Sequence, residues 1–368
     1  MKIAMLISGG VDSSVALRLL KEDKSHEITA FYIKIWMEDK FSFLGKCPWQ
    51  EDLKYVEEVC DKLEIPLEIV NLQKEYWQQV VSEAVKEVKR GHTPNPDVLC
   101  NSRVKFGVFY DYFGKNFDQV ATGHYAQVYP LCPVYPLCPA PQDISPLPRG
   151  RKYLLKKSPD PVKDQTYFLA LLSQEQLAKA LFPIGHLTKK KVRALAKKFD
   201  LPNQDRPDSQ GICFLGKIKY RDFLQEQLGV RKGDIINVEN GKKMGQHNGF
   251  WHYTIGQRKD IKLSGGPWYV TAKDVKKNIV YIAHGNILMV KARDEFLLGE
   301  AHWISGIKPD KKNLQVKIRH GEGSYKCRVN FLKRRVAVKL DQADTGVAAG
   351  QYAVFYDKDI CLGGGVIQ

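Results

Sequence analysis

A glycine- and serine-rich turn near the start of the chain constrains the fold more than any other stretch. Ser8 to Ser14 reads SGGVDSS, follows the apolar run Ile3 to Ile7, and leads into a segment, 15–20, that can form a helix. A buried strand, a turn without bulky side chains and a helix N-terminus together make an anion site, because backbone N–H groups, hydroxyls and the helix dipole all favour negative charge. No Gly-Lys-Ser/Thr sequence closes the turn, so it is not a Walker A loop.

This turn resembles the pyrophosphate loop (PP-loop) of ATP pyrophosphatases, enzymes that adenylate a carbonyl oxygen and release pyrophosphate. After it, apolar runs alternate with helical patterns to about residue 125, with strands expected at 27–36, 67–70 and 119–122. Strand–helix alternation predicts a parallel, doubly wound sheet, which binds ligands at the carboxyl ends of its strands. We therefore expect an ATP pyrophosphatase domain over 1–207.

The pattern changes in the rest of the chain. Residues 130–149 repeat Pro-Leu-Cys-Pro, and proline at this density predicts an extended surface insertion. One helix is expected at 215–229, followed by short strands and glycine-rich turns. From 284 onward, short alternating segments are typical of a small β-barrel or sandwich. We predict a multidomain α/β protein: the doubly wound parallel-sheet domain, a small central α+β domain over 208–283, and a C-terminal β-barrel over 284–368.

The charge balance points to a second, polyanionic partner. The 368 residues include 57 Lys and Arg against 41 Asp and Glu, a net charge of +16. In a chain with an ATP-type loop, nucleic acid is the leading candidate, although charge alone equally fits a basic enzyme without a specific target. No run of about 18 apolar residues could span a membrane. With a strand expected from the second residue, we expect no signal or transit peptide and a cytoplasmic location.

Cysteine chemistry is indicated at Cys100, in the loop Thr93–Asn101. The chain has eight cysteines and no CxxC pair, so we expect neither a zinc knuckle nor an iron–sulfur cluster. Asp97, three residues before Cys100, could shuttle protons. Activating the thiol would need a helix beginning near Asn101, or a cation such as Arg103 or Lys105. A structural cysteine is the alternative.

A second cysteine, Cys213, follows a polar, glycine-containing loop, which favours an accessible and reactive thiol over a structural cysteine at a domain junction. Just upstream, 188–199 has apolar residues on one helical face and lysines elsewhere. This face is either solvated or contacts nucleic-acid phosphates. Cys132 and Cys138 in the proline-rich insertion could pair or bind a metal, but the neighbouring sequence offers no further ligands.

Taken together and in order, the motifs resemble the tRNA-specific 2-thiouridylase family over nearly the whole chain outside the insertion. The matching motifs are SGGVDSS at 8–14, TPNPDVLCN at 93–101 with Lys105-Phe106, GHYA at 123–126, KDQTYF at 163–168, SQGICF at 209–214 and YTIGQR at 253–258. Asp260 stands where the family commonly has glycine.

The resemblance implies a role for each matched residue. The ATP-binding residues would be Leu6, Ile7, Ser8, Gly9, Gly10, Val11, Asp12, Ser13, Ile33 and Gly123. Asn95, Pro96 and Asp97 would contact the target uridine. The other tRNA contacts would be His124, Lys163, Asp164, Gln165, Arg319, His320 and Gln351. Cys213 would carry the sulfur as a persulfide, and Cys100 would be the second catalytic thiol, with Asp97 beside it in sequence.

The implied reaction is ATP-dependent 2-thiolation of the wobble uridine, U34, of tRNA. ATP adenylates the C2 oxygen because that oxygen is a poor leaving group, and the base must first leave the anticodon stack. Sulfur then passes from Cys213 to C2, either directly or as hydrosulfide, and both routes require Cys100. Mg²⁺ is expected with ATP, with Asp12 as a ligand. The expected partners are tRNA and a persulfide donor, either a cysteine desulfurase or a sulfur-relay protein. We expect a monomer.

Three other functions fit parts of the sequence. A PP-loop synthetase that forms an amide or argininosuccinate would need neither Cys100 nor Cys213. A cluster-dependent tRNA thiolase would need a CxxC pair and a third cysteine nearby. A non-enzymatic RNA-binding protein built on the C-terminal barrel would not need the ATP loop. The combined motifs favour the 2-thiouridylase.

Overall fold

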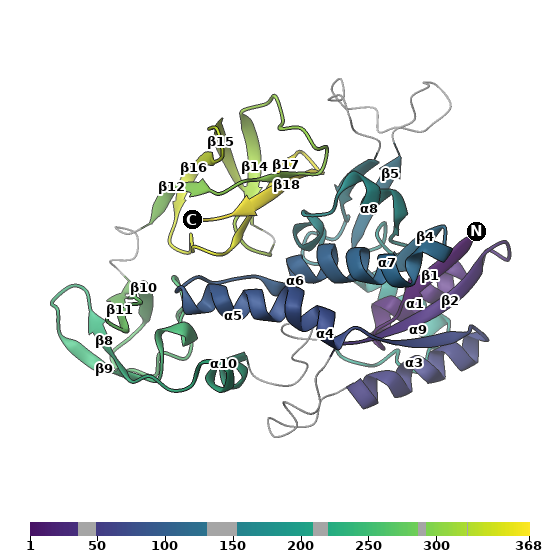
Figure 1. Ribbon diagram of the computed structural model, residues 1–368, viewed down its shortest axis with the longest axis horizontal. Helices are drawn as coiled ribbons and strands as arrows, with labels where there is room; N and C mark the ends of the chain where they lie inside the picture. The colour runs from purple at the N-terminus through teal and green to yellow at the C-terminus, as the bar shows by residue number, and fades with distance from the viewer. Residues whose placement is uncertain (36–48, 131–152, 209–219, 286–291, 322) are drawn as a thin grey trace.

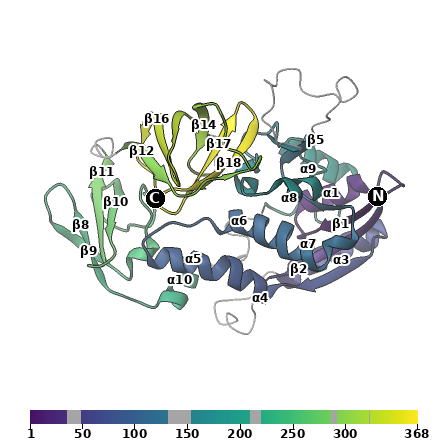
Figure 2. The ribbon, with the colours of Figure 1, turned by 45° about the horizontal axis from the view of Figure 1, so that its top comes forward.

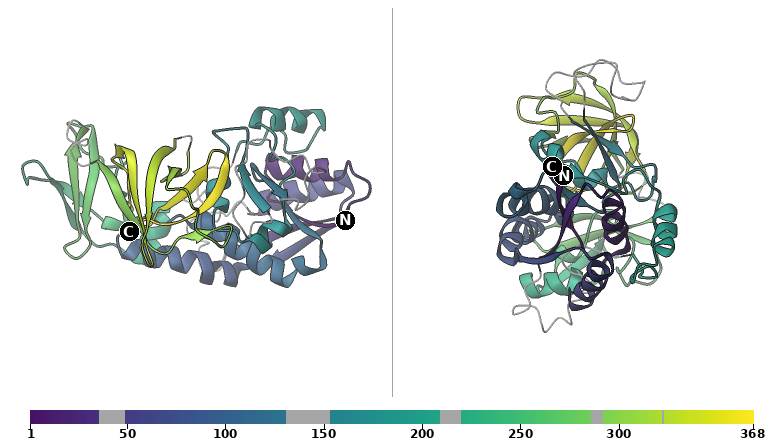
Figure 3. Two further views of the ribbon diagram at one scale, coloured as in Figure 1. Left: turned by 90° about the horizontal axis from the view of Figure 1, so that it is seen from above. Right: turned by 90° about the vertical axis from the view of Figure 1, so that its right-hand side faces the viewer.

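The computed structural model describes residues 1–35, 49–130, 153–208, 220–285, 292–321 and 323–368. Three sheets mark three parts of the molecule (Figure 1). The N-terminal sheet and the central sheet lie at opposite ends, and the C-terminal sheet lies between them, beside helix α5 (Ser82–Lys89) (Figures 1 and 3).

The N-terminal sheet is parallel throughout and has the strand order β3-β2-β1-β4-β7. Its strands are β1 (Lys2–Leu6), β2 (Glu27–Lys34), β3 (Leu67–Asn71), β4 (Gln119–Thr122) and β7 (Ala180–Leu181). The chain runs outward from β1 to β3 and then returns to the other side of β1. This reversal beside β1 creates a switch point, where open α/β sheets bind their ligands.

Helices cover both faces of this sheet, because side chains along β1 alternate between two cores. Ile3 and Met5 belong to the core beneath α1 (Val11–Leu20), α3 (Trp49–Leu63) and α9 (Lys189–Lys198). Ala4 and Leu6 belong to the opposite core. The elements on that side are α4 (Gln73–Tyr76), the π-helix η2 (Trp77–Val81), α5, α6 (Pro96–Leu99), the π-helix η3 (Cys100–Val108), α7 (Phe109–Tyr112) and α8 (Gln174–Lys179). The short 3₁₀ helices η4 (Gly114–Asn116) and η5 (Thr166–Leu169) lie in the loops.

The central part combines helix α10 (Tyr220–Leu228) with a mixed sheet of order β10-β11-β8-β9. Its strands are β8 (Gly233–Asn237), β9 (Lys243–His247), β10 (Trp268–Asp274) and β11 (Ile279–His284), with the 3₁₀ helix η6 (Phe250–His252) between β9 and β10. A small core, including Ile235, Val270 and Val280, lies on one face of this sheet.

The C-terminal part is a closed antiparallel barrel. Its strands are β12 (Arg293–Leu298), β13 (His302–Trp303), β14 (Asn313–Lys317), β15 (Tyr325–Phe331), β16 (Val336–Asp344), β17 (Tyr352–Asp357) and β18 (Ile360–Val366). A bridge between Leu298 and Ile367 joins the end of β12 to the end of the chain beyond β18, which closes the cylinder. Its interior core includes Val316, Val338 and Phe355.

A hairpin from the N-terminal part extends the barrel sheet. Strands β5 (Ala126–Pro130) and β6 (Tyr153–Lys157) pair with each other, and β6 pairs with β18 through Leu155–Cys361 and Lys156–Ile360. In Figure 2, β5 lies on the side of the N-terminal part that faces the barrel strands β17 and β18. The two parts therefore share one continuous sheet.

The predicted fold class is confirmed: a doubly wound parallel sheet, a central α+β part and a C-terminal barrel. Strand β2 ends at Lys34 and not at 36, because its pairing with β3 ends there, opposite Asn71. The helix expected at 215–229 is described from Tyr220 onward. The insertion lies outside the described residues except for Pro130. The domain boundaries stay a prediction.

Candidate active site

The SGGVDSS turn connects the carboxyl end of β1 to the first residue of α1, Val11. Gly9 has a φ of +74°, and a Cβ placed there would lie 2.6 Å from the backbone oxygen of Asp52. A side chain is therefore excluded at Gly9 by both conformation and space. Gly10 is in ordinary extended conformation, and its Cβ would meet only Ser8 Oγ, at 3.5 Å.

Polar side chains fix the shape of this loop. Ser13 Oγ donates to Gly10 O at 2.9 Å and accepts from Ser8 N at 3.3 Å. From behind, Asn203 Nδ2 donates to Gly9 O at 2.8 Å, and Arg206 Nη1 donates to the same oxygen at 2.9 Å. These hydrogen bonds restrict the conformation of the turn, which reduces the entropy lost when it binds a ligand.

The end of β4 lies against the first turn of α1. A Cβ on Gly123 would lie 2.7 Å from Ser13 N, so only glycine allows this contact. The next residue, His124, is 8% exposed, and its Nδ1 shares a 2.7 Å hydrogen bond with Thr122 Oγ1. Burial holds the pKa of His124 well below its usual value, so its ring is neutral at pH 7. Ile33 lies on the neighbouring strand β2, opposite Val70.

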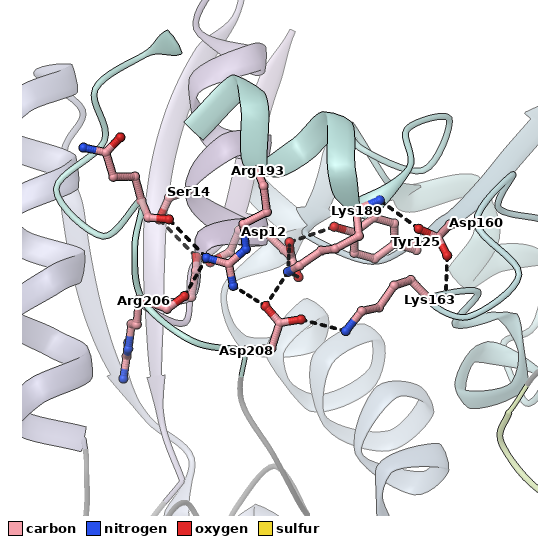
Figure 4. A network of polar contacts seen from close by, with 12 residues as sticks. Asp12, Ser14, Tyr125, Asp160, Lys163, Lys189, Arg193, Arg206 and Asp208 are labelled. Atoms are coloured by element: carbon pink, nitrogen blue, oxygen red, sulfur yellow. Dashed lines mark hydrogen bonds and ion pairs between the residues drawn. The ribbon is translucent and has the colours of Figure 1, made fainter. Parts of the chain in front are cut away.

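A network of carboxylates and cations lies over the loop (Figure 4). Asp12 accepts from Lys189 Nζ at 2.7 and 2.9 Å and from the Tyr125 hydroxyl at 2.8 Å. Burial and the neighbouring Asp12 charge raise the pKa of Tyr125, so it stays a donor. Lys189 Nζ also contacts Asp208 Oδ1 at 2.7 Å, and Lys163 Nζ donates to Asp208 Oδ2 at 2.7 Å.

The KDQ motif joins this network to the barrel. Gln165 Oε1 accepts from Tyr125 N at 2.9 Å. Asp164 is 2% exposed and forms an ion pair with the buried Lys317 of β14 at 3.3 Å. The carboxylate of Asp164 therefore faces inward, and the tRNA contact expected of this residue stays a prediction. In this buried position, the Asp164 side chain can fix the loop.

The thiol predicted to be catalytic, Cys100, lies within a helix and not just before one. Pro96 is the first residue of α6, and Asn95 occupies the N-cap position. The helix continues as a π-helix from Cys100, which is 3% exposed. The expected helix start near Asn101 is thus wrong, because the fixed φ of proline at the first position favours an earlier start. Arg103 Nη1 donates to Gln79 O at 2.9 Å.

The loop that precedes Cys100 is where all three parts of the chain meet. Thr93 N donates to Ala349 O at 2.8 Å, and Gln351 Nε2 donates to Thr93 O at 2.8 Å, so the barrel holds this backbone on both sides. Thr93 Oγ1 also contacts Thr254 Oγ1 of the central YTIGQR motif at 3.4 Å. Asn95, Pro96 and Asp97 follow directly from this anchored point.

Arg319 and His320 lie next to each other at the end of β14. Arg319 makes two hydrogen bonds to Asp344, at 2.9 and 2.7 Å. The ring of His320 stacks on Phe168 with centroids 4.5 Å apart, and its Nε2 lies 3.3 Å from Asp164 O. The structure therefore brings His320 beside the KDQTYF motif, more than a hundred residues away in sequence.

Cys213, Cys132 and Cys138 lie outside the described residues, so the separation of Cys100 and Cys213 is not part of the structure. Three other cysteines are buried: Cys60, Cys327 and Cys361. Burial raises the pKa of each of these thiols to about 12, which leaves them protonated and inert at neutral pH.

Several residues around the loop carry no motif signal: Lys189, Arg193, Asn203 and Arg206. Lys189 of α9 contacts Asp12, and Asn203 and Arg206, which follow α9, contact Gly9 O. Arg193 contacts Asp208 and the backbone oxygens of Gln204 and Arg206. The lysine-rich pattern of 188–199 was one available signal. Lys189 points into the network, whereas Lys190 and Lys191 are exposed, and the two interpretations of the lysine-rich face stay open.

Within the part of the chain that the structure describes, no group of three or more His, Cys, Asp or Glu side chains could hold a metal ion. In the same residues, no helix is both long and apolar enough to cross a lipid bilayer.

Three family models match consecutive parts of the chain: a tRNA methyl transferase HUP domain over 1–217, a tRNA methyl transferase PRC-barrel domain over 221–284, and an aminomethyltransferase beta-barrel domain over 293–367. Among solved structures, the U34-tRNA thiolase NcsA from Methanococcus maripaludis is a distant likeness, with 18% identity, a TM-score of 0.35, and 62% of this chain and 65% of that chain covered. That likeness is too distant to bear on the chemistry.

Curated relatives match over the full length. The tRNA-specific 2-thiouridylase MnmA of Parabacteroides distasonis is 44% identical, with 100% of this chain and 99% of the relative covered. The corresponding MnmA 1 of Bacteroides thetaiotaomicron is 43% identical with the same coverage, and MnmA of Porphyromonas gingivalis is 41% identical, again with the same coverage. Identity at this level, sustained through all three parts of the fold, shows that the chain belongs to the tRNA-specific 2-thiouridylase family.

Proposed function

We propose that this chain catalyses ATP-dependent 2-thiolation of the wobble uridine of tRNA. The observation that carries the proposal is an intact phosphate loop, with Gly9 in its left-handed conformation, in a chain whose full length matches tRNA-specific 2-thiouridylases. The excess of basic residues, which gives a net charge of +16, suits a tRNA substrate.

Activation of the uridine is the first step. The C2 oxygen of the base attacks the α-phosphorus of ATP, an O–P bond forms, and the bond to the β-phosphate oxygen breaks. The electron pair leaves with pyrophosphate, and C2 now carries AMP as a good leaving group. The ATP contacts would come from Leu6 to Ser13, with Ile33 and Gly123 beside the nucleotide. The hydrogen bonds that fix the shape of the loop support this.

Sulfur transfer would use Cys213 and Cys100. The terminal sulfur of a Cys213 persulfide attacks C2, and AMP departs with its electron pair. The Cys100 thiolate then attacks the Cys213 sulfur, which releases 2-thiouridine and leaves a Cys100–Cys213 disulfide for an external thiol to reduce. In the second route, Cys100 attacks the persulfide first, and the released hydrosulfide attacks C2. Both routes end in the same disulfide and require both thiols.

The tRNA would lie across the junction of the three parts. Asn95, Pro96 and Asp97 would hold the flipped base, a role supported by the anchoring of Thr93 to the barrel. The remaining proposed contacts are His124, Lys163, Asp164, Gln165, the exposed pair Arg319–His320, and Gln351, which also holds Thr93. A persulfide-carrying cysteine desulfurase or relay protein would load Cys213, and the chain would act as a monomer.

Mg²⁺ would accompany ATP and reduce the repulsion between its phosphates and an incoming nucleophile. Asp12 fits as a single hard-oxygen ligand, because its carboxylate is 31% exposed beside the loop. Lys189 currently contacts both Asp12 oxygens, so this fit requires the lysine to move toward the phosphates.

Reconstitution tests the proposal. Purified protein with ATP, Mg²⁺, tRNA and a persulfide source should form 2-thiouridine, detected by retardation on a mercury-containing gel, and should release pyrophosphate. Cys100→Ser and Cys213→Ser should release pyrophosphate without thiolating tRNA. Cys60→Ser is the matched control, since its thiol is buried and inert, and it should thiolate like the wild type.

Two results would count against this function. If the wild type never forms 2-thiouridine, the activity is wrong. If Cys100→Ser and Cys213→Ser both thiolate normally, the ATP site stands but the cysteine mechanism does not.

A further inference from the structure

Two cations of helix α9, Lys189 and Arg193, lie beside the phosphate loop without belonging to any recognised motif (Figure 4). Lys189 contacts Asp12 of the loop, whereas Arg193 Nη1 donates to Gln204 O at 3.1 Å and to Arg206 O at 2.6 Å. Their side chains are 16% and 28% exposed. Both contact Asp208 Oδ1, Lys189 at 2.7 Å and Arg193 through Nη2, and Lys189 also contacts Asp12. Lys163 contacts the other oxygen of Asp208. One carboxylate thus receives three cationic side chains.

The placement of Lys189 is unfavourable for the helix itself. It is the first residue of α9, where the helix dipole is positive and acidic residues stabilise, yet the first turn contains lysines and no acid. A helix whose charges served stability alone would have acidic residues in its first turn. The position of Lys189 therefore favours a role toward an anion, and its exposed neighbours Lys190 and Lys191 show that this role is specific to one residue of the turn.

Asp208 presents its two oxygens to these cations much as a phosphate group would. Burial alone would raise the pKa of Asp208, but hydrogen bonds from Lys163 and Lys189, together with the Lys189 charge and Arg193, hold it far below its usual value. The carboxylate is thus fully ionised at neutral pH. Of these cations, Lys189 also contacts Asp12, which is part of the loop that binds triphosphate in the proposed function.

We propose that Lys189 and Arg193 bind the β- and γ-phosphates of ATP and stabilise the departing pyrophosphate, and that Asp208 occupies these two side chains until the nucleotide displaces it. The inference rests on the proposed function, since it assigns the pyrophosphate end of the same site. When the bond between the α-phosphorus and the bridging oxygen breaks, its electron pair goes to pyrophosphate. Once Asp208 is displaced, the two cations offset that charge where it develops.

The test compares binding of magnesium pyrophosphate, ATP and AMP by titration calorimetry, with tRNA binding measured separately. Lys189→Met and Arg193→Met should each weaken pyrophosphate and ATP binding roughly ten- to a hundredfold, the effect of losing one charge-assisted hydrogen bond. AMP and tRNA binding should stay within about twofold. Lys190→Met, an exposed lysine in the same helical turn, is the matched control and should bind all four ligands normally.

Asp208→Asn should change pyrophosphate affinity in the opposite direction, so this test does not depend on a loss of binding. Removing the internal anion should tighten pyrophosphate binding severalfold, with the folded state checked by thermal unfolding. If Asp208→Asn weakens pyrophosphate binding, or if Lys189→Met weakens tRNA binding alone, the inference is overturned. If the wild type binds neither ATP nor pyrophosphate, the proposed function itself fails. If it binds both and Lys189→Met matches Lys190→Met, only the inference fails.

Discussion

At Gly9, both the backbone conformation and the available space require glycine. Its φ of +74° is rare for a residue with a side chain, and the Asp52 carbonyl lies where a Cβ would be. Asp260 shows the milder case. It has a φ of +63°, so this position uses the left-handed conformation that glycine, the residue common in the family, adopts freely. Aspartate tolerates this conformation better than most residues, which explains why Asp260 can occupy the left-handed position in this turn.

Gly9→Ala should therefore destabilise the protein by about 1–3 kcal/mol and abolish high-affinity ATP binding. Gly10→Ala is the matched control one residue later, because its Cβ would make only an ordinary contact, 3.5 Å from Ser8 Oγ. Its unfolding free energy should stay within about 0.5 kcal/mol of the wild type. Urea unfolding monitored by tryptophan fluorescence measures the unfolding free energy of both variants. Equal losses in the two variants would show that the geometry at Gly9 is not the cause.

At the scale of elements, the π-helix η3 that begins at Cys100 depends on a side chain from another helix. Gln176 Nε2 donates to Ser102 O at 2.7 Å and to Phe106 O at 2.9 Å. The same residue completes the capping box of α8, where its Oε1 accepts from Ser173 N and its own N–H donates to Ser173 Oγ. Gln176 thus couples the start of α8 to the helix that carries the proposed thiol.

Gln176→Ala should cost about 2 kcal/mol of stability, since it removes both the cap and two donors. Gln176→Glu separates the two roles, because a carboxylate still accepts from Ser173 N but cannot donate to the carbonyls of η3. We expect Gln176→Glu to slow tRNA thiolation at least tenfold while pyrophosphate release stays nearly unchanged. Single-turnover assays of the two steps measure this. Thiolation at the wild-type rate in both variants would disprove the coupling.

For the whole molecule, the three parts form one assembly and not a row of independent domains. The β5–β6 hairpin of the N-terminal part continues the barrel sheet at β18, and Thr93 is held by both the barrel and the central part. Neutral histidines occur in two of these parts: the buried His124 beside the loop, and the buried His247 and half-buried His252 in the central part. Burial lowers the pKa of all three, that of His252 to about 4.

These histidines predict acid lability. Each binds a proton more readily in the unfolded state, whose pKa is about 6.5, than in the folded state. Stability should therefore be complete above about pH 6.5 and decrease as the pH falls from there toward 4. The urea midpoint should be lower at pH 5.5 than at pH 7.5, and His124→Gln should reduce that difference. A midpoint that is constant or rises on acidification contradicts the prediction.

The local features of this protein could be predicted from its sequence alone. The apolar run before Ser8, the glycines of the turn and the alternation of strands and helices predict the parallel sheet and its anion site, because these depend on neighbouring residues and on periodicity. The motifs in order predicted the family, which the full-length relatives confirm. The predicted ATP, tRNA and thiol residues remain proposals.

Only the tertiary structure decided which distant groups meet. Lys189, Lys190 and Lys191 are identical in type, and the phase of α9 against α1 alone turns the first of them toward Asp12. Asp164 belongs to a motif, yet packing against β14 buries its carboxylate beside Lys317. The physical reason is common to both cases. Charge and side-chain type are properties of a residue, whereas burial and partner depend on how separate elements pack.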